Sequence, residues 1–300
     1  MKLDCYRLIA ALLLSCLVTE APAASDRPAA HYIVPSEADP AVKQFDDPSI
    51  GIASAGLPMD APLAVFLPGT GGKPADALSL LRTIARQGYR VLGLEYDDVP
   101  AVAQECPRDP DPDCSAAFRD MRVNGRGSSR AVVLNTVAEA IIPRLVAALR
   151  LLDKAAPDEG WGRYLAGDQP RWERIVVSGL SQGAGMAAYM AKQHEVRRVV
   201  LFSSPWDFTG RERRPAPWLS RPSATPPGRW YAEYHRREDT APLIAAAYAA
   251  LAIPAGNIRI FDRDLPHDPR TRGRNPYHGS TIQDPGYAPQ WRAMFGRGVP

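Results

Sequence analysis

Short apolar segments alternate with amphipathic segments along residues 60–300. The apolar runs are rich in Val, Leu, Ile and Phe and are bounded by turn residues, whereas between them apolar positions recur every three or four residues. Apolar runs of this kind are typical of strands buried on both faces of a parallel sheet. Strands are therefore expected at 63–69, 90–96, 174–180, 197–205, 229–235 and 257–262.

The intervening segments have the period of α-helices. Because strand and helix alternate throughout, the sequence predicts the α/β class, with a doubly wound, mostly parallel sheet and helices on both faces. A proline inside a helix removes a hydrogen bond, so Pro143 is expected to kink the second helix. The helices are expected at 74–88, 128–156, from Gln182 onward, around 241–252 and after Ser280.

The chain is long enough for one large globular domain. It has 300 residues, of which 45% are apolar, and this amount of apolar surface supports a sizeable core. A single domain is expected over residues 25–300. Residues 206–228 interrupt the alternation with prolines, arginines and tryptophans, and this segment is expected to form a short lid or rim insertion.

The first 24 residues have the features of an export signal. Lys2 and Arg7 precede an apolar stretch, and an A-x-A pattern ends at Ala23. The stretch is too short for a membrane-spanning helix, so a secreted or periplasmic protein without a transmembrane segment is expected. The run LLLSC also approximates a bacterial lipid-attachment signal, which would leave the protein lipid-anchored through Cys16.

Charge and cysteine content narrow the classes of protein further. The formal net charge of +3 comes from acids and bases spread along the chain, which argues against nucleic-acid binding. After removal of the leader, Cys106 and Cys114 remain and are expected to form a disulfide. Three aspartates between them alternate with prolines, which splay the carboxylates and disfavour a calcium site. No metal and no cofactor are expected.

Residues 179–183 read Gly-Leu-Ser-Gln-Gly between an expected strand and an expected helix. This is the G-x-S-x-G pattern, in which the chain turns so sharply that side chains two residues before and after the serine would clash. Gly179 and Gly183 satisfy that steric demand. The turn would expose the hydroxyl of Ser181 beside the unpaired amides at the helix N-terminus, where a developing oxyanion is stabilised.

With this motif in an α/β alternation, the chain resembles the α/β-hydrolase superfamily over residues 60–300, and in particular its secreted bacterial branch of serine esterases and lipase-like enzymes. The resemblance implies a second oxyanion donor in the loop after the first strand. That loop reads LPGTGG, with Pro68 at the position of the family's histidine. The matching backbone donors are Thr70 and Gln182.

The resemblance also implies a histidine base and a carboxylate, in the chain order serine, acid, histidine. Among the five histidines, His278 is the expected base and His267 the alternative. Asp239, after the strand at 229–235, is the expected acid. Asp207 is the alternative acid, and Glu238 ranks below both.

These residues predict acyl transfer to water through an acyl-enzyme on Ser181. The expected substrate is a small-molecule or lipid-like carboxylic ester. A peptidase or an acyltransferase with the same triad remains an alternative, as does a non-catalytic envelope or binding protein on the same fold. The sequence does not specify the acyl group, the alcohol or the oligomeric state.

Overall fold

The computed structural model describes residues 29–126, 135–210, 213–265 and 275–299. Its centre is an eight-stranded sheet in the order β1-β2-β4-β3-β7-β8-β11-β12. The strands are β1 (Ala29–Ile33), β2 (Ser49–Ala53), β3 (Leu63–Leu67), β4 (Arg90–Gly93), β7 (Ile175–Leu180), β8 (Arg198–Phe202), β11 (Trp230–His235) and β12 (Ile258–Phe261).

Six of these strands, from β4 to β12 in the order above, run parallel. Strand β2 is antiparallel to both of its neighbours. The predicted strands are confirmed, with ends shifted by up to three residues, whereas β1 and β2 were not predicted. The α/β class with a mostly parallel sheet is likewise confirmed.

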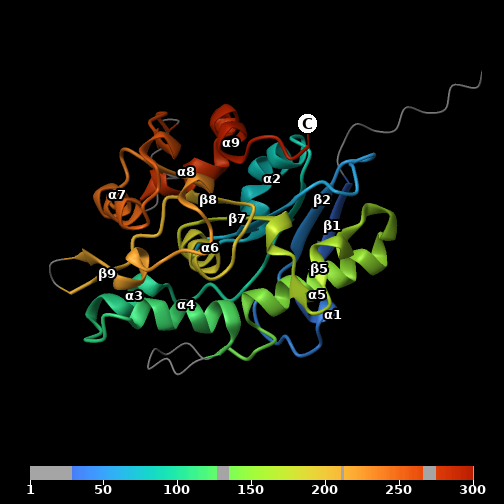
Figure 1. Ribbon diagram of the computed structural model, residues 1–300, viewed down its shortest axis with the longest axis horizontal. Coiled ribbons are helices and arrows are strands. Elements are labelled where there is room, and N and C mark those ends of the chain that lie inside the picture. The colour runs from blue at the N-terminus through green and yellow to red at the C-terminus, as the bar shows by residue number, and fades with distance from the viewer. Residues whose placement is uncertain (1–28, 127–134, 211–212, 266–274, 300) are drawn as a thin grey trace, which may run out of the picture.

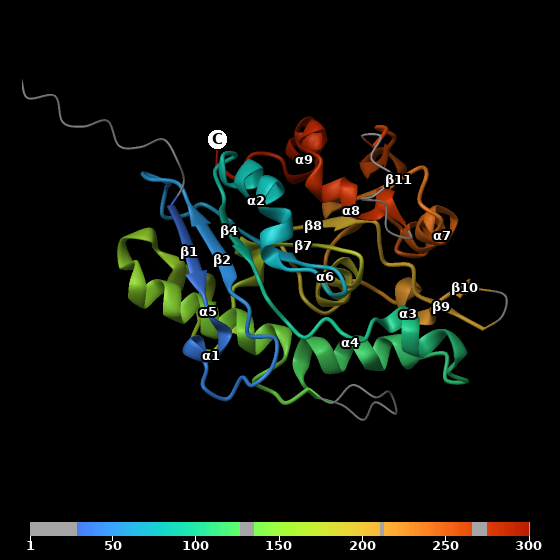
Figure 2. The same cartoon turned by 180° about the vertical axis from the view of Figure 1, so that it is seen from behind.

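Helices cover both faces of the sheet (Figures 1 and 2). Along β3, Leu63, Val65 and Leu67 belong to one hydrophobic core, whereas Ala64 and Phe66 belong to the other. Successive side chains of a strand point to opposite faces, which explains why the whole run is apolar. One core is covered by α4 (Cys114–Asn124), α5 (Ile141–Ala155) and α6 (Gln182–Gln193), and the other by α2 (Leu78–Ala85), α8 (Pro276–Gln283) and α9 (Ala288–Phe295).

Helix α5 corrects the expectation of a long kinked helix. Residues 135–140 are not helical, and α5 begins only at Ile141; residues 128–134 lie outside the described part of the chain. Pro143 is the third residue of α5, where a backbone N–H has no partner within the helix. The first turn of the helix therefore accommodates the proline without a kink. Helix α4, before this segment, was not predicted.

The disulfide between Cys106 and Cys114 is formed, as predicted, with the two Cα atoms 5.5 Å apart. Cys114 is the first residue of α4, so the bond fixes the start of this helix to the preceding loop.

The remaining predictions about segments have mixed outcomes. The expected rim contains two short strands, β9 (Phe208–Thr209) and β10 (Arg214–Pro215), which pair in antiparallel fashion; its role as a lid stays a prediction. Helix α7 (Ala241–Ala250) is present as expected. The leader and Cys16 lie outside the described residues. Among the described residues, no helix has both the length and the apolar content needed to cross a membrane.

Candidate active site

The G-x-S-x-G segment forms a sharp corner between β7 and α6. Ser181 stands between them with φ 54° and ψ −120°, a conformation that side chains with a Cβ rarely adopt. A Cβ on Gly179 would lie 2.5 Å from the carbonyl carbon of Gly183, and one on Gly183 would lie 2.2 Å from Leu67 O. The corner therefore requires glycine at both positions.

The corner lies at the carboxyl edge of the parallel strands, where α/β proteins place their ligand sites. The Ser181 N–H donates to Phe202 O at the end of the neighbouring strand β8, at 2.9 Å. A half-buried serine at a strained strand-to-helix turn on top of such a sheet has the backbone geometry of a nucleophile elbow. The chain has the α/β-hydrolase fold.

The loop after β3 lies directly beside Ser181. Its turn is closed by a hydrogen bond from Gly72 N–H to Gly69 O, at 2.8 Å. A Cβ on Gly69 would lie 3.1 Å from Ser181 Cβ, so the close approach of the loop depends on a residue without a side chain. Thr70 follows at the tip of this turn and lines the same pocket as Ser181.

Gln182 is the first residue of α6, and an N–H at this position has no partner within the helix. Its side chain is buried and fastens the corner to the segment after β4. The amide oxygen accepts from Val102 N–H at 3.1 Å, and the amide nitrogen donates to Pro100 O at 3.0 Å. The backbone N–H of Gln182 is thus held in a fixed orientation beside Ser181.

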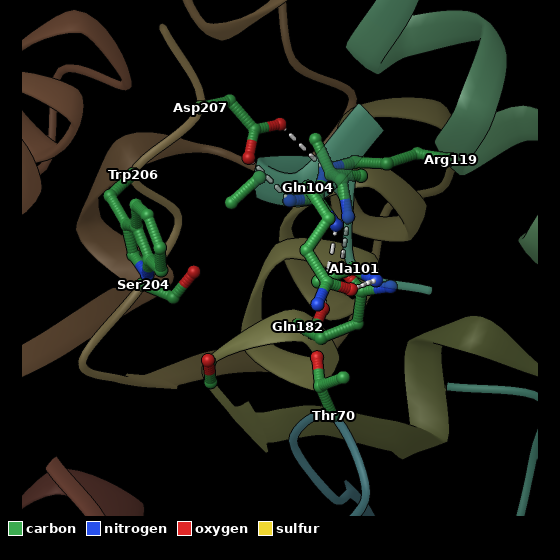
Figure 3. Close-up of a pocket in the computed structure, with 11 residues that line it drawn as sticks. Thr70, Ala101, Gln104, Arg119, Gln182, Ser204, Trp206 and Asp207 are labelled. Atoms are coloured by element: carbon green, nitrogen blue, oxygen red, sulfur yellow. Dashed lines mark hydrogen bonds and ion pairs between the residues drawn. The ribbon is translucent and has the colours of Figure 1, made fainter. Parts of the chain in front are cut away.

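A pocket of about 320 Å³ opens at Ser181. Besides the serine and the two expected oxyanion residues, its walls come from residues 101–104, from Arg119 on α4, and from Ser204, Trp206 and Asp207 after β8. Figure 3 shows Trp206 and Ser204 on one side of this pocket, with Gln104 and Ala101 on the other. The walls are mostly apolar.

Asp207, the alternative acid, forms a buried ion pair with Arg119. Arg119 Nε donates to Asp207 Oδ2 at 2.8 Å, and Arg119 Nη2 donates to Asp207 Oδ1 at 2.6 Å. The indole N–H of Trp218 donates to Asp207 Oδ2 at 2.9 Å. Both carboxylate oxygens are therefore committed to groups other than a histidine, which argues against Asp207 as the acid.

His278 is paired with Glu238. Their side chains form a hydrogen bond between His278 Nδ1 and Glu238 Oε2 at 2.6 Å. Glu238 is buried in the loop after β11, where its Oε1 accepts from Ser203 Oγ at 2.5 Å and from His235 N–H at 2.8 Å. Three donors thus hold the carboxylate of Glu238 in one orientation, facing the imidazole ring.

This pairing involves a different carboxylate from the one expected from the sequence. Asp239 is exposed, and its neighbour Glu238 contacts the imidazole instead. The helix expected after Ser280 begins earlier in the chain. Helix α8 begins at Pro276, so His278 lies in its first turn. No sequence signal distinguishes two adjacent carboxylates, because only the turn after β11 decides which side chain faces inward.

The fold brings Ser181, Thr70 and Gln182 together in one pocket and joins His278 to Glu238. Within the described residues, no hydrogen bond links the serine hydroxyl to the imidazole. His267, the alternative base, lies outside the described residues.

Three further buried carboxyl groups lie at this edge of the molecule and were not singled out from the sequence. Burial raises the pKa of Glu95 to about 7 and that of Asp98 to about 6. Lys73 Nζ, at the end of the loop after β3, lies 3.0 Å from Glu95 Oε1. On β11, burial and the nearby charge of Glu238 raise the pKa of Glu233 well above its ordinary value.

The chain is similar to known proteins in structure but not in sequence. In sequence, no family model and no curated protein matches the chain. In structure, the chain is similar to an esterase from the bacterial hormone-sensitive lipase family, at 17% identity over 93% of this chain and 87% of that one, with a TM-score of 0.49. It is also similar to Thermogutta terrifontis esterase 2 (15% identity, 90% and 96% coverage, TM-score 0.45) and to a putative dienelactone hydrolase from Klebsiella pneumoniae (12%, 90% and 99%, 0.46).

Proposed function

We propose that this protein is a serine hydrolase that cleaves carboxylic esters through an acyl-enzyme on Ser181. The observation that carries the proposal is the strained corner at this serine, which adjoins two backbone segments suited to bind an oxyanion. Strain of this kind costs free energy and is typical of functional sites. A serine in a purely structural turn has no need of it.

In the proposed mechanism, Ser181 Oγ attacks the ester carbonyl carbon and His278 takes its proton. The negative charge that develops on the carbonyl oxygen is stabilised by the N–H groups of Thr70 and Gln182. The imidazolium then protonates the leaving alcohol, and the acyl-enzyme is hydrolysed by water that the same imidazole activates.

Glu238 is proposed as the acid of the triad, in place of Asp239. Its contact with Nδ1 of His278 keeps the proton on that nitrogen and leaves Nε2 available as the base. The ionised carboxylate also stabilises the imidazolium that forms in the transition state. The hydrogen bonds from Ser203 Oγ and His235 N–H support this orientation.

Export is proposed as well. The leader over residues 1–24 has the composition of a signal peptide, and the disulfide between Cys106 and Cys114 fits an oxidising compartment. The natural substrate is accordingly expected to be an extracellular or periplasmic ester.

The test is covalent labelling with a fluorophosphonate, followed by assays with p-nitrophenyl esters. The wild-type protein should be labelled on Ser181. Ser181→Ala should abolish labelling and reduce kcat/KM by about 10⁴-fold or more. Equal labelling of both proteins would place the nucleophile elsewhere, and a wild-type protein that neither reacts with the probe nor cleaves esters would refute the function.

A further inference from the structure

The pocket at Ser181 is lined by only some of the proposed catalytic residues. Which of them line it indicates which half of the ester the pocket binds. Among the described residues that line it are the serine and both oxyanion donors, Thr70 and Gln182, but neither His278 nor Glu238. An ester bound for attack has its carbonyl group at the serine and its leaving oxygen facing the imidazole that protonates it. The leaving alcohol therefore belongs on the histidine side, and the pocket is left for the acyl group.

The walls of the pocket are suited to an apolar acyl group. One wall is the segment 101–104, which begins with Ala101, Val102 and Ala103, and the opposite wall includes the ring of Trp206. Burial of apolar surface against such walls favours binding of hydrocarbon. Its volume of about 320 Å³ lies at the small end of the usual range for ligand pockets, about 300–1,000 Å³.

The ion pair between Arg119 and Asp207 also lines the pocket, and both side chains are buried. Two N–H groups of the guanidinium are directed at the carboxylate, and a third donates weakly to Gln182 O at 3.4 Å. The two charges neutralise each other inside the pocket. An anionic or cationic acyl group would lose its hydration there without meeting an unpaired counter-charge.

From these observations we infer that the pocket binds the acyl group of the substrate and selects short, uncharged, apolar acyl groups. In this inference, the carboxylate of Asp207 neutralises the charge of Arg119 and so keeps the pocket without net charge. The inference rests on the proposed function. It adds a specificity role for Asp207, which the sequence suggested only as a catalytic acid, and it assigns the alcohol to the side of His278.

The first experiment compares two esters of equal chain length. The wild-type enzyme is assayed with p-nitrophenyl pentanoate and with the mono-p-nitrophenyl ester of glutaric acid, which carries a distal carboxylate. We expect kcat/KM to favour the neutral ester by about 100-fold, because the site offers the carboxylate no free partner. A ratio near one would overturn the inference.

Asp207→Asn then tests the source of the selectivity. This change leaves Arg119 without its counter-charge, and the preference for the neutral ester should fall by about tenfold or more. An unchanged ratio would refute the role of Asp207. Since an unbalanced buried charge can prevent folding, Ala103→Phe provides a second variant that adds no charge.

Ala103→Phe fills the apolar wall. The variant should lower kcat/KM for p-nitrophenyl hexanoate at least about tenfold more than it lowers kcat/KM for p-nitrophenyl acetate. In a second series, acetate esters of progressively longer alcohols should have the same relative rates with the variant as with the wild type. Ala249→Phe, at an exposed position on α7, is the matched control and should leave both series unchanged. An effect of Ala103→Phe on the alcohol series alone would reverse the assignment of the two halves of the substrate.

Labelling of Ser181 separates the two levels of the proposal. If the wild-type protein is labelled but shows no preference between the neutral and anionic esters, the acyl-site inference fails and the hydrolase function stands. If Ser181 is not labelled and no ester is cleaved, the proposed function itself fails.

Discussion

His278 Nδ1 lies 2.6 Å from Glu238 Oε2, whereas Asp239, the next residue along the chain, is exposed to solvent. Two adjacent carboxylates in one loop thus occupy opposite environments. Glu238 is buried and receives hydrogen bonds from three groups, and this arrangement is what an imidazole base needs to hold one tautomer.

A pair of substitutions at these two carboxylates tests the assignment. Glu238→Gln should reduce kcat/KM by about 10³- to 10⁴-fold, because the amide no longer stabilises an imidazolium and can impose the wrong tautomer on His278. Asp239→Asn should change kcat/KM by no more than about threefold, since a surface charge contributes little. Initial rates with a p-nitrophenyl ester measure both effects, and the opposite ranking would restore Asp239 as the acid.

The motif glycines should be intolerant of even one methyl group. Gly183→Ala would push a Cβ to 2.2 Å from Leu67 O, so the backbone must shift, and we expect the free energy of unfolding to fall by about 3 kcal/mol. Urea denaturation followed by circular dichroism measures the change. Gly256→Ala is the control, because a Cβ there meets nothing within 4 Å. Equal stability of the two variants would contradict the tight corner.

Glu95 makes stability depend on pH. Burial raises its pKa to about 7 in the folded protein, from 4.5 in a solvated chain. Between these two values the folded state holds the proton more tightly than the unfolded state does, so the contribution of Glu95 to stability is present at low pH and is lost as the pH rises toward 7. The shift corresponds to about 3 kcal/mol.

Urea denaturation from pH 4.5 to 7.5 measures this dependence. Glu95→Gln cannot ionise, so its free energy of unfolding relative to wild type should increase as the pH rises across this range. The exposed Glu37 provides the control, because Glu37→Gln should follow the wild-type curve. A Glu95→Gln curve parallel to that of the wild type would show that folding does not raise the pKa of Glu95.

The disulfide should stabilise the protein through the loop that precedes α4. In the chain-entropy model, closing a loop of this length contributes about 2 to 3 kcal/mol. The double substitution Cys106→Ala and Cys114→Ala should therefore lower the free energy of unfolding by about this amount. Wild-type protein treated with a reductant should match the double variant. A loss below about 0.5 kcal/mol would mean that the loop is already ordered without the bond.

Local sequence alone determined the parts of this protein that depend on neighbouring residues. The G-x-S-x-G corner could be predicted because the clash that requires glycine at Gly179 and Gly183 arises between a strand and the helix that directly follows it. The buried strands could be predicted because continuous apolar runs are typical of strands in a sheet that is covered on both faces. The pairing of Cys106 with Cys114 was predicted because they are the two cysteines outside the expected leader.

Tertiary structure decided what depends on contacts between distant segments. Arg119 and Asp207 are separated by 88 positions, so nothing near Asp207 in the sequence reveals that its carboxylate is already paired. His278 and Glu238 are 40 positions apart, and only the turn after β11 determines that Glu238 points inward while Asp239 points to solvent. The physical reason is that loops from several parallel strands meet at one edge of the sheet, where burial and ion pairing fix the role of each side chain.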